Sequence, residues 1–169
     1  GYRVIVPDQI GFGLSEKPAG HAVHSLDNHA ANVVALLDAL DLRGVTFVLH
    51  DWGGPTGLAA LHTRPARAAA VAVMSTWAWL EPSSAFHHGV VPWRFMHAPL
   101  SGPYLLGRHG AMPARGMYLS VVDRDRFAAG PRAADEEVVA DPDERRLTHT
   151  WPRWIPLDDW LQGFSGRRW

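Results

Sequence analysis

The sequence predicts an α/β fold in which helices cover a parallel sheet and a helical region follows. Apolar, β-branched runs alternate with helical patterns in the order strand, helix, strand, helix, strand, which is typical of a parallel, helix-covered sheet. From Trp77 onward Pro, Gly, His and Trp become frequent and no clean strand pattern returns. The chain has 169 residues, of which 47% are hydrophobic, enough for one domain with a sizeable core.

The core elements are expected in the first 80 residues. Residues 3–7 form a β-rich run that ends in a long turn marked by glycines and prolines. Apolar residues from Leu26 to Leu40 recur at helical spacing, which predicts a helix of about four turns with Ser25 or Asp27 as N-cap. A second strand is expected over residues 45–49, a second helix from Pro55 and a third strand over residues 68–75.

Composition narrows the classes of partner and location. The formal net charge is −1, from 16 basic and 17 acidic residues that are dispersed along the chain, so neither nucleic acid nor an anionic membrane surface is expected as a partner. The expected partner is a small neutral molecule. The absence of cysteine excludes disulfides and thiolate chemistry, and no apolar run approaches the ~20 residues that span a bilayer. These features favour a cytoplasmic protein.

The turn His50-Asp51-Trp52-Gly53-Gly54 carries the main functional prediction. A residue between a parallel strand and a helix lies at the carboxyl edge of the sheet, where α/β proteins bind ligands, and the first helical turn keeps a carboxylate ionised. Asp51 is thus a candidate nucleophile that would form a covalent ester, or alternatively only an N-cap. The indole N–H of Trp52 suits a leaving group that develops negative charge, such as halide, and core packing is its alternative role.

Three segments, "RVIVPDQIGFGLSEKP", "HDWGGP" and "MSTWAWLEP", resemble the haloalkane dehalogenase branch of the α/β-hydrolase fold, with epoxide hydrolases close by. The resemblance implies a partial α/β-hydrolase core over residues 1–80 and a helical cap over residues 81–169. It also implies that Asp51 displaces halide from a small apolar substrate, that Trp52 donates to the halide, and that a histidine activates the water that cleaves the ester. An epoxide hydrolase would use the same aspartate with two cap tyrosines, for which Tyr104 and Tyr118 are the candidates.

Several parts of that family's machinery are not found in the sequence. None of the ten histidines matches the catalytic base, and Ser75 stands where some members carry the acid, while Glu81 is expected to start the cap. The central strand with its His-Gly motif, which the family places between the strands at residues 3–7 and 45–49, is also missing. We therefore expect a fragment or a degenerate copy that is inactive and poorly stable alone. A non-catalytic remnant that binds small apolar molecules in a Trp-lined hollow is the alternative.

No cofactor or metal is expected. The stretch "GFGLSE" lacks the third glycine of a dinucleotide fingerprint and continues into Lys17-Pro18 instead of a helix. The side chains of the adjacent pair His87 and His88 diverge, and no third ligand stands at the right spacing.

Overall fold

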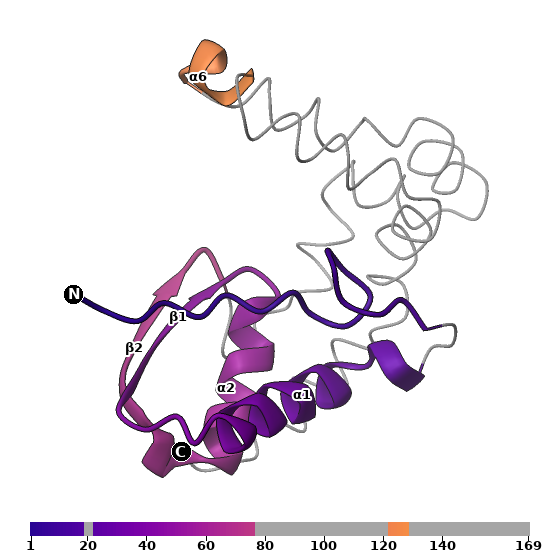
Figure 1. The fold of residues 1–169 in the computed structure, drawn as a ribbon, viewed down its shortest axis with the longest axis vertical. Helices are drawn as coiled ribbons and strands as arrows, with labels where there is room; N and C mark the ends of the chain where they lie inside the picture. The colour runs from indigo at the N-terminus through magenta and orange to yellow at the C-terminus, as the bar shows by residue number, and fades with distance from the viewer. Residues whose placement is uncertain (19–21, 77–121, 129–169) are drawn as a thin grey trace, which may run out of the picture. The chain divides into compact units, whose positions relative to one another are not determined.

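The computed structural model describes residues 1–18, 22–76 and 122–128, and the chain divides into two compact units. Residues 1–18 and 122–128 belong to one unit, and residues 22–76 belong to the other. The elements of the second unit are η1 (Ala22–His24), α1 (Leu26–Ala39), β1 (Val45–His50), α2 (Gly53–Thr63), η2 (Pro65–Arg67) and β2 (Ala68–Met74), while α6 (Arg124–Ala128) lies in the first (Figure 1).

The sheet of the second unit is parallel, as predicted. β1 and β2 pair from Thr46 opposite Ala70 to His50 opposite Met74, with one irregularity beside Val45. The connection between them contains α2, which is the crossover that parallel strands require. Both strands lie within one residue of the predicted ranges at each end.

The prediction of a strand over residues 3–7 is wrong. Residues 1–9 form no regular element, and the side chains of Tyr2, Val4 and Val6 are 96%, 77% and 83% exposed. A β-rich run becomes a strand only where a neighbouring strand takes up its N–H and C=O groups, so β propensity alone does not decide the structure of this run. The described part of the chain thus contains two strands of the predicted three.

α1 begins and ends with well-defined caps. Ser25 is the N-cap, since its hydroxyl accepts a hydrogen bond of 3.2 Å from the N–H of Asn28, and the alternative cap Asp27 lies in the first turn. At the other end Asp41 has φ 42°, and the N–H of Leu42 donates to the carbonyl of Leu37 at 2.9 Å. This is a Schellman motif, which turns the chain toward β1.

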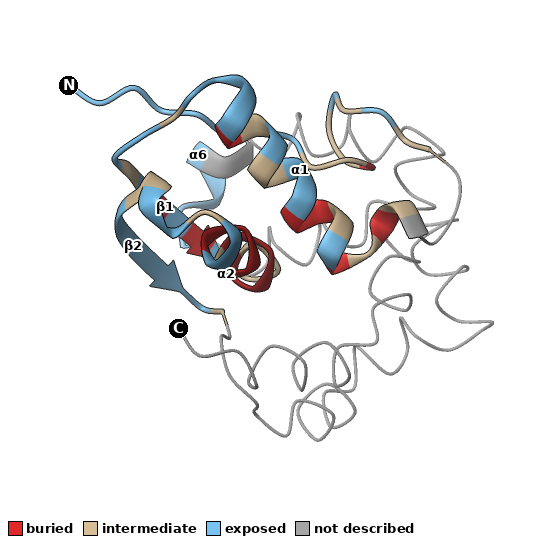
Figure 2. Cartoon of the chain, turned by 90° about the horizontal axis from the view of Figure 1, so that it is seen from below, coloured by how far each residue is buried: buried red, intermediate tan, exposed pale blue. Residues whose placement is uncertain are grey.

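The core lies between the two helices and one face of β1. Leu37 of α1, Phe47 and Leu49 of β1 and Leu61 of α2 form a buried cluster. Most of α2 is buried, whereas β2 is largely exposed (Figure 2). A Cβ on Gly57 would collide with the Leu49 side chain, so glycine lets α2 lie close to β1.

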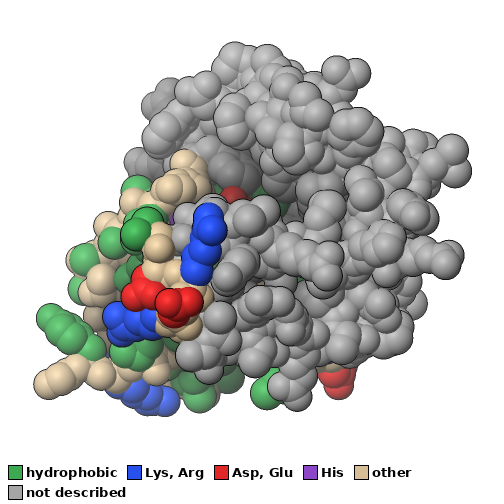
Figure 3. Space-filling model, turned by 90° about the horizontal axis from the view of Figure 1, so that it is seen from above, with side chains coloured by type: hydrophobic (Ala, Val, Ile, Leu, Met, Phe, Trp, Pro, Cys, Tyr) green, Lys and Arg blue, Asp and Glu red, His purple; other side chains and the backbone are tan. Residues whose placement is uncertain are grey.

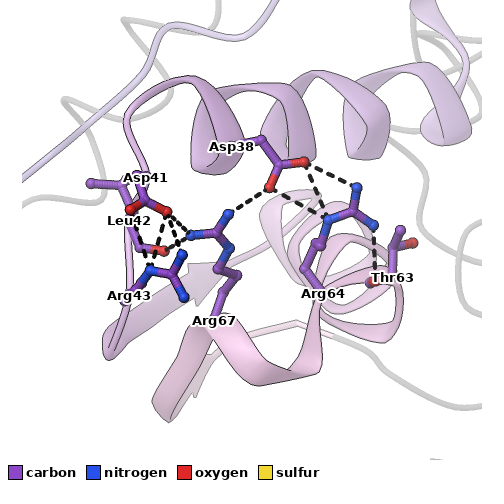
Figure 4. A network of polar contacts seen from close by, with 7 residues as sticks. All are labelled: Asp38, Asp41, Leu42, Arg43, Thr63, Arg64 and Arg67. Atoms are coloured by element: carbon purple, nitrogen blue, oxygen red, sulfur yellow. Dashed lines mark hydrogen bonds and ion pairs between the residues drawn. The ribbon is translucent and has the colours of Figure 1, made fainter.

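An ion-pair network joins the end of α1 to the segment after α2 (Figure 4). Asp38 accepts from Arg64 and Arg67 at 3.0 Å each, and Arg67 also donates to Asp41 at 2.6 Å. The hydrogen bond from Arg64 holds the pKa of the Asp38 carboxyl below its ordinary value, and that from Arg67 does the same for the pKa of Asp41.

A pair of buried histidines lies at the start of α1. His24 and His29 are 0% and 1% exposed, and their ring centroids are 6.3 Å apart. Burial, and then repulsion from His24, lowers the pKa of His29 to about 4. The sequence pattern did not single out either residue.

Apolar side chains remain on the surface of the described part (Figure 3). On the strands, Val48, Val73 and Met74 are 64%, 56% and 50% exposed. None of the helices in the described ranges has the length and apolar character needed to cross a bilayer. The predicted cap, residues 81–169, lies outside the described residues except for 122–128.

Candidate active site

The candidate site is the sharp turn between β1 and α2. The strand ends at His50 and the helix begins at Gly53, so Asp51 and Trp52 alone reverse the chain. Asp51 has φ 48°, a left-handed conformation that only a few per cent of non-glycine residues adopt. The N–H of Gly54 donates to the Asp51 carbonyl at 3.0 Å and closes the turn. Such strained residues are concentrated at functional sites.

The alternative role of Asp51 as a simple N-cap does not fit this geometry. The N-cap of α2 is Trp52, which has helical dihedral angles and makes no side-chain cap bond. The Asp51 Oδ1 accepts from the N–H of Trp52 at 2.7 Å, and not from the second or third helical residue as an N-cap oxygen would.

The two oxygens of the half-buried Asp51 carboxylate differ in their surroundings. Oδ1 is held by the Trp52 N–H, whereas no group in the described ranges donates to Oδ2. The N-terminus of α2 adjoins the carboxylate, and the positive end of a helix dipole favours negative charge nearby. One oxygen is therefore anchored by the backbone, and the other has no hydrogen-bond donor among the described residues.

A second strand end meets this turn. Ser75, directly after β2, also has positive φ, 41°, and the hydroxyl of the next residue, Thr76, donates to the Asp51 carbonyl at 2.6 Å. A Cβ on Gly54 would overlap the Thr76 hydroxyl, so a glycine is needed there for the contact. Sequence reasoning named Ser75 but missed Thr76, because its role depends on the pairing of β1 with β2.

Trp52 is the other predicted site residue, and the remaining residues below were weighed in the sequence analysis in other roles or as alternatives. Trp52 is half-buried at the turn, and His50 is exposed at the end of β1. Glu81, Tyr104, Tyr118, the pair His87 and His88, and the tryptophans from Trp77 onward all lie outside the described residues. Within the ranges that are described, no three His, Cys, Asp or Glu side chains are grouped to hold a metal ion.

A left-handed residue on a sharp turn between a parallel strand and a helix has the backbone form of the nucleophile elbow of one class of hydrolases. The chain belongs to the alpha/beta hydrolase fold family, whose model matches residues 1–97. The resemblance stated from the sequence motifs is therefore confirmed at the level of family and fold.

Its relatives include haloalkane dehalogenases. This chain is 28% identical over 173 residues to the haloalkane dehalogenase of Psychrobacter cryohalolentis. The match covers 97% of this chain and 56% of that protein. Haloalkane dehalogenase 2 of Mycobacterium bovis is 37% identical over 78 residues, 46% of this chain and 27% of the relative. The chain thus spans about half the length of the first of these relatives.

A solved structure has a similar fold. The haloalkane dehalogenase DatA from Agrobacterium tumefaciens C58 superposes with a TM-score of 0.69 over 92% of this chain and 55% of its own, at 24% identity. At that identity the likeness concerns the fold.

Proposed function

We propose that the protein hydrolyses carbon–halogen bonds of small haloalkanes, with Asp51 as the nucleophile. The observation that carries this proposal is the strained Asp51 at the elbow, with Oδ1 held by the Trp52 N–H at 2.7 Å and no donor to Oδ2 among the described residues. The names of the relatives, haloalkane dehalogenases from two bacteria, support the choice of substrate class.

In the first step Oδ2 attacks the carbon that bears the halogen. The carbon–oxygen bond of an Asp51 ester forms as the carbon–halogen bond breaks, and the halide leaves with the bonding electron pair. Trp52 would donate its indole N–H to the developing halide, which is worth most in a site from which water is excluded.

In the second step water adds to the carbonyl carbon of the ester, the alcohol leaves, and the carboxylate is restored. A base must accept the proton of that water. None of the ten histidines among these 169 residues matches the family's base, so we expect the ester to form and to persist on a polypeptide made of these residues.

The domain division belongs to the same proposal. A core over residues 1–80 would carry the nucleophile, and a helical cap over residues 81–169 would close over an apolar substrate. A cytoplasmic location is likewise a prediction.

Mass spectrometry of the intact chain and of its peptides tests the nucleophile. After incubation with 1-bromobutane we expect one butyl group on the peptide that contains Asp51, and none in Asp51→Ala. The unmodified peptide around Asp41 is the internal control, because Asp41 is also a left-handed aspartate, with φ 42°, but is exposed and paired with arginines. We further expect Trp52→Phe to slow ester formation by about tenfold through loss of one donor.

A parallel incubation with 1,2-epoxybutane separates the alternatives. A hydroxybutyl adduct on Asp51 with the epoxide alone would assign epoxide hydrolysis, for which Tyr104→Phe and Tyr118→Phe would be the next variants. No adduct from either reagent would contradict a working nucleophile and favour the non-catalytic binding role.

A further inference from the structure

One peptide unit of the elbow is hydrogen-bonded at both ends. The carbonyl of Asp51 accepts from the Thr76 hydroxyl at 2.6 Å and from the Gly54 N–H at 3.0 Å. The N–H of that same peptide, which belongs to Trp52, donates to the Asp51 Oδ1 at 2.7 Å. A continuous path therefore runs from the Thr76 hydroxyl through a single planar group to the carboxylate.

A hydrogen bond accepted at the carbonyl end of a peptide affects the hydrogen bond that its N–H end donates. The carbonyl and the N–H of a peptide share delocalised electrons, so a bond accepted by the oxygen polarises the N–H and strengthens its donation. The bond also fixes the plane of the peptide, and with it the direction in which the N–H points. Removing the hydroxyl would therefore both weaken and misalign the contact that anchors Oδ1.

The surrounding residues are shaped to permit this contact. Thr76 reaches the elbow just after Ser75, whose left-handed conformation ends β2, and Gly54 has no Cβ where the hydroxyl lies. The bond joins the ends of two neighbouring strands, so it is formed by tertiary structure and not by the turn itself.

We propose that Thr76 is a positioning residue for the nucleophile, acting on the Asp51 carboxylate through the Asp51–Trp52 peptide. The inference rests on the proposed function, because it concerns the orientation of the same carboxylate. It assigns to Thr76 an effect on the rate of ester formation and not on the affinity for the haloalkane.

The kinetic test compares variants of the full chain that differ in one hydroxyl. Rates of Asp51 butylation are measured at several 1-bromobutane concentrations for Thr76→Ser, Thr76→Ala and Thr76→Val. We expect a limiting rate about tenfold lower in the Ala and Val variants, an unchanged half-saturating concentration, and a rate within about threefold of wild type in Thr76→Ser. Thr63→Val is the matched control, since that hydroxyl also donates to a backbone carbonyl, of Ala59 at 3.2 Å, but away from the elbow.

A second readout does not depend on reactivity. Hydrogen exchange of the Trp52 amide, followed by NMR, is expected to be about tenfold faster in Thr76→Ala than in Thr76→Ser. Equal butylation rates in the Ser and Ala variants would overturn the proposal, and so would equal exchange of the Trp52 amide. If the wild-type chain forms no adduct while the exchange difference is found, the proposed function fails and the positioning of the peptide stands.

Discussion

At the scale of single residues, the two glycines that follow Trp52 have different tasks. A Cβ on Gly54 would overlap the Thr76 hydroxyl, whereas a Cβ on Gly53 meets nothing within 4 Å. We predict that Gly54→Ala lowers the free energy of unfolding by about 1–3 kcal/mol through overpacking. Gly53→Ala is the matched control and should be neutral or stabilising by up to about 1 kcal/mol, because alanine favours helix.

Urea unfolding followed by circular dichroism measures both variants. Equal midpoints for the two would contradict the close approach of Gly54 to Thr76.

His29 gives the second prediction at this scale. Its folded-state pKa of about 4 lies below the ordinary value of 6.5, so the unfolded chain binds a proton that the folded chain does not. The free energy of unfolding is therefore not reduced by His29 above pH 6.5, where the ring is neutral in both states. It falls by about 3 kcal/mol in total as the pH falls toward 4. The buried face of α2, which packs on α1, carries no titratable group that would oppose this.

The measurement is the unfolding free energy from pH 7.5 to pH 4 for wild type, His29→Gln and His62→Gln. We expect a flatter profile only in His29→Gln, since His62 is exposed at the end of α2. A wild-type profile that is flat between pH 6.5 and pH 4 would refute the prediction.

At the scale of elements, the network around Asp38 ties α1 to the segment after α2. We predict that Arg64→Gln lowers the urea midpoint, and more strongly at 20 mM than at 500 mM salt, because partly exposed ion pairs are screened. Arg43→Gln is the control, since its pair with Asp41 is 74% and 65% exposed and should contribute little.

Acid weakens this network by protonating the Asp38 carboxylate. Because the folded-state pKa of Asp38 is lowered from 3.8, the stabilisation is present above pH 3.8 and is lost as the pH falls below it.

In the salt experiment, a urea midpoint for Arg64→Gln equal to that of Arg43→Gln at both salt concentrations would show that the network does not fasten the two elements.

Elements whose partners are close in the sequence were the ones that could be predicted. Within residues 26–74, α1, β1 and α2 bury one another's apolar faces and β2 pairs with β1, so the sequence pattern of these elements reports their structure. The run at residues 3–7 has equal β propensity, but propensity supplies no partner for its backbone groups. The sharp turn at Asp51 could be predicted because Asp51 and its glycines are contiguous. The contacts of Thr76 and of the pair His24 and His29 could not, because tertiary structure brings these residues to their partners.

At the scale of the whole molecule, β1 and β2 leave apolar surface uncovered. Val48, Val73 and Met74 are each at least half exposed, and such strands are prone to associate. We predict that the purified chain self-associates in gel filtration and is cleaved rapidly by protease. The double variant Val48→Lys, Val73→Lys should elute later than wild type, while a compact, protease-resistant wild-type monomer would contradict the prediction.

The bond between Thr76 and Asp51 joins residues 25 positions apart in the chain, and that interval holds all of α2 and β2. The smallest stretch that carries the complete elbow therefore extends through residue 76, well past the Asp-Trp-Gly-Gly letters by which a motif search would find it. A library of truncated or shuffled hydrolases that ends its segments inside β2 would keep the motif and lose the geometry. Segment boundaries for transplanting this turn are better chosen after Thr76.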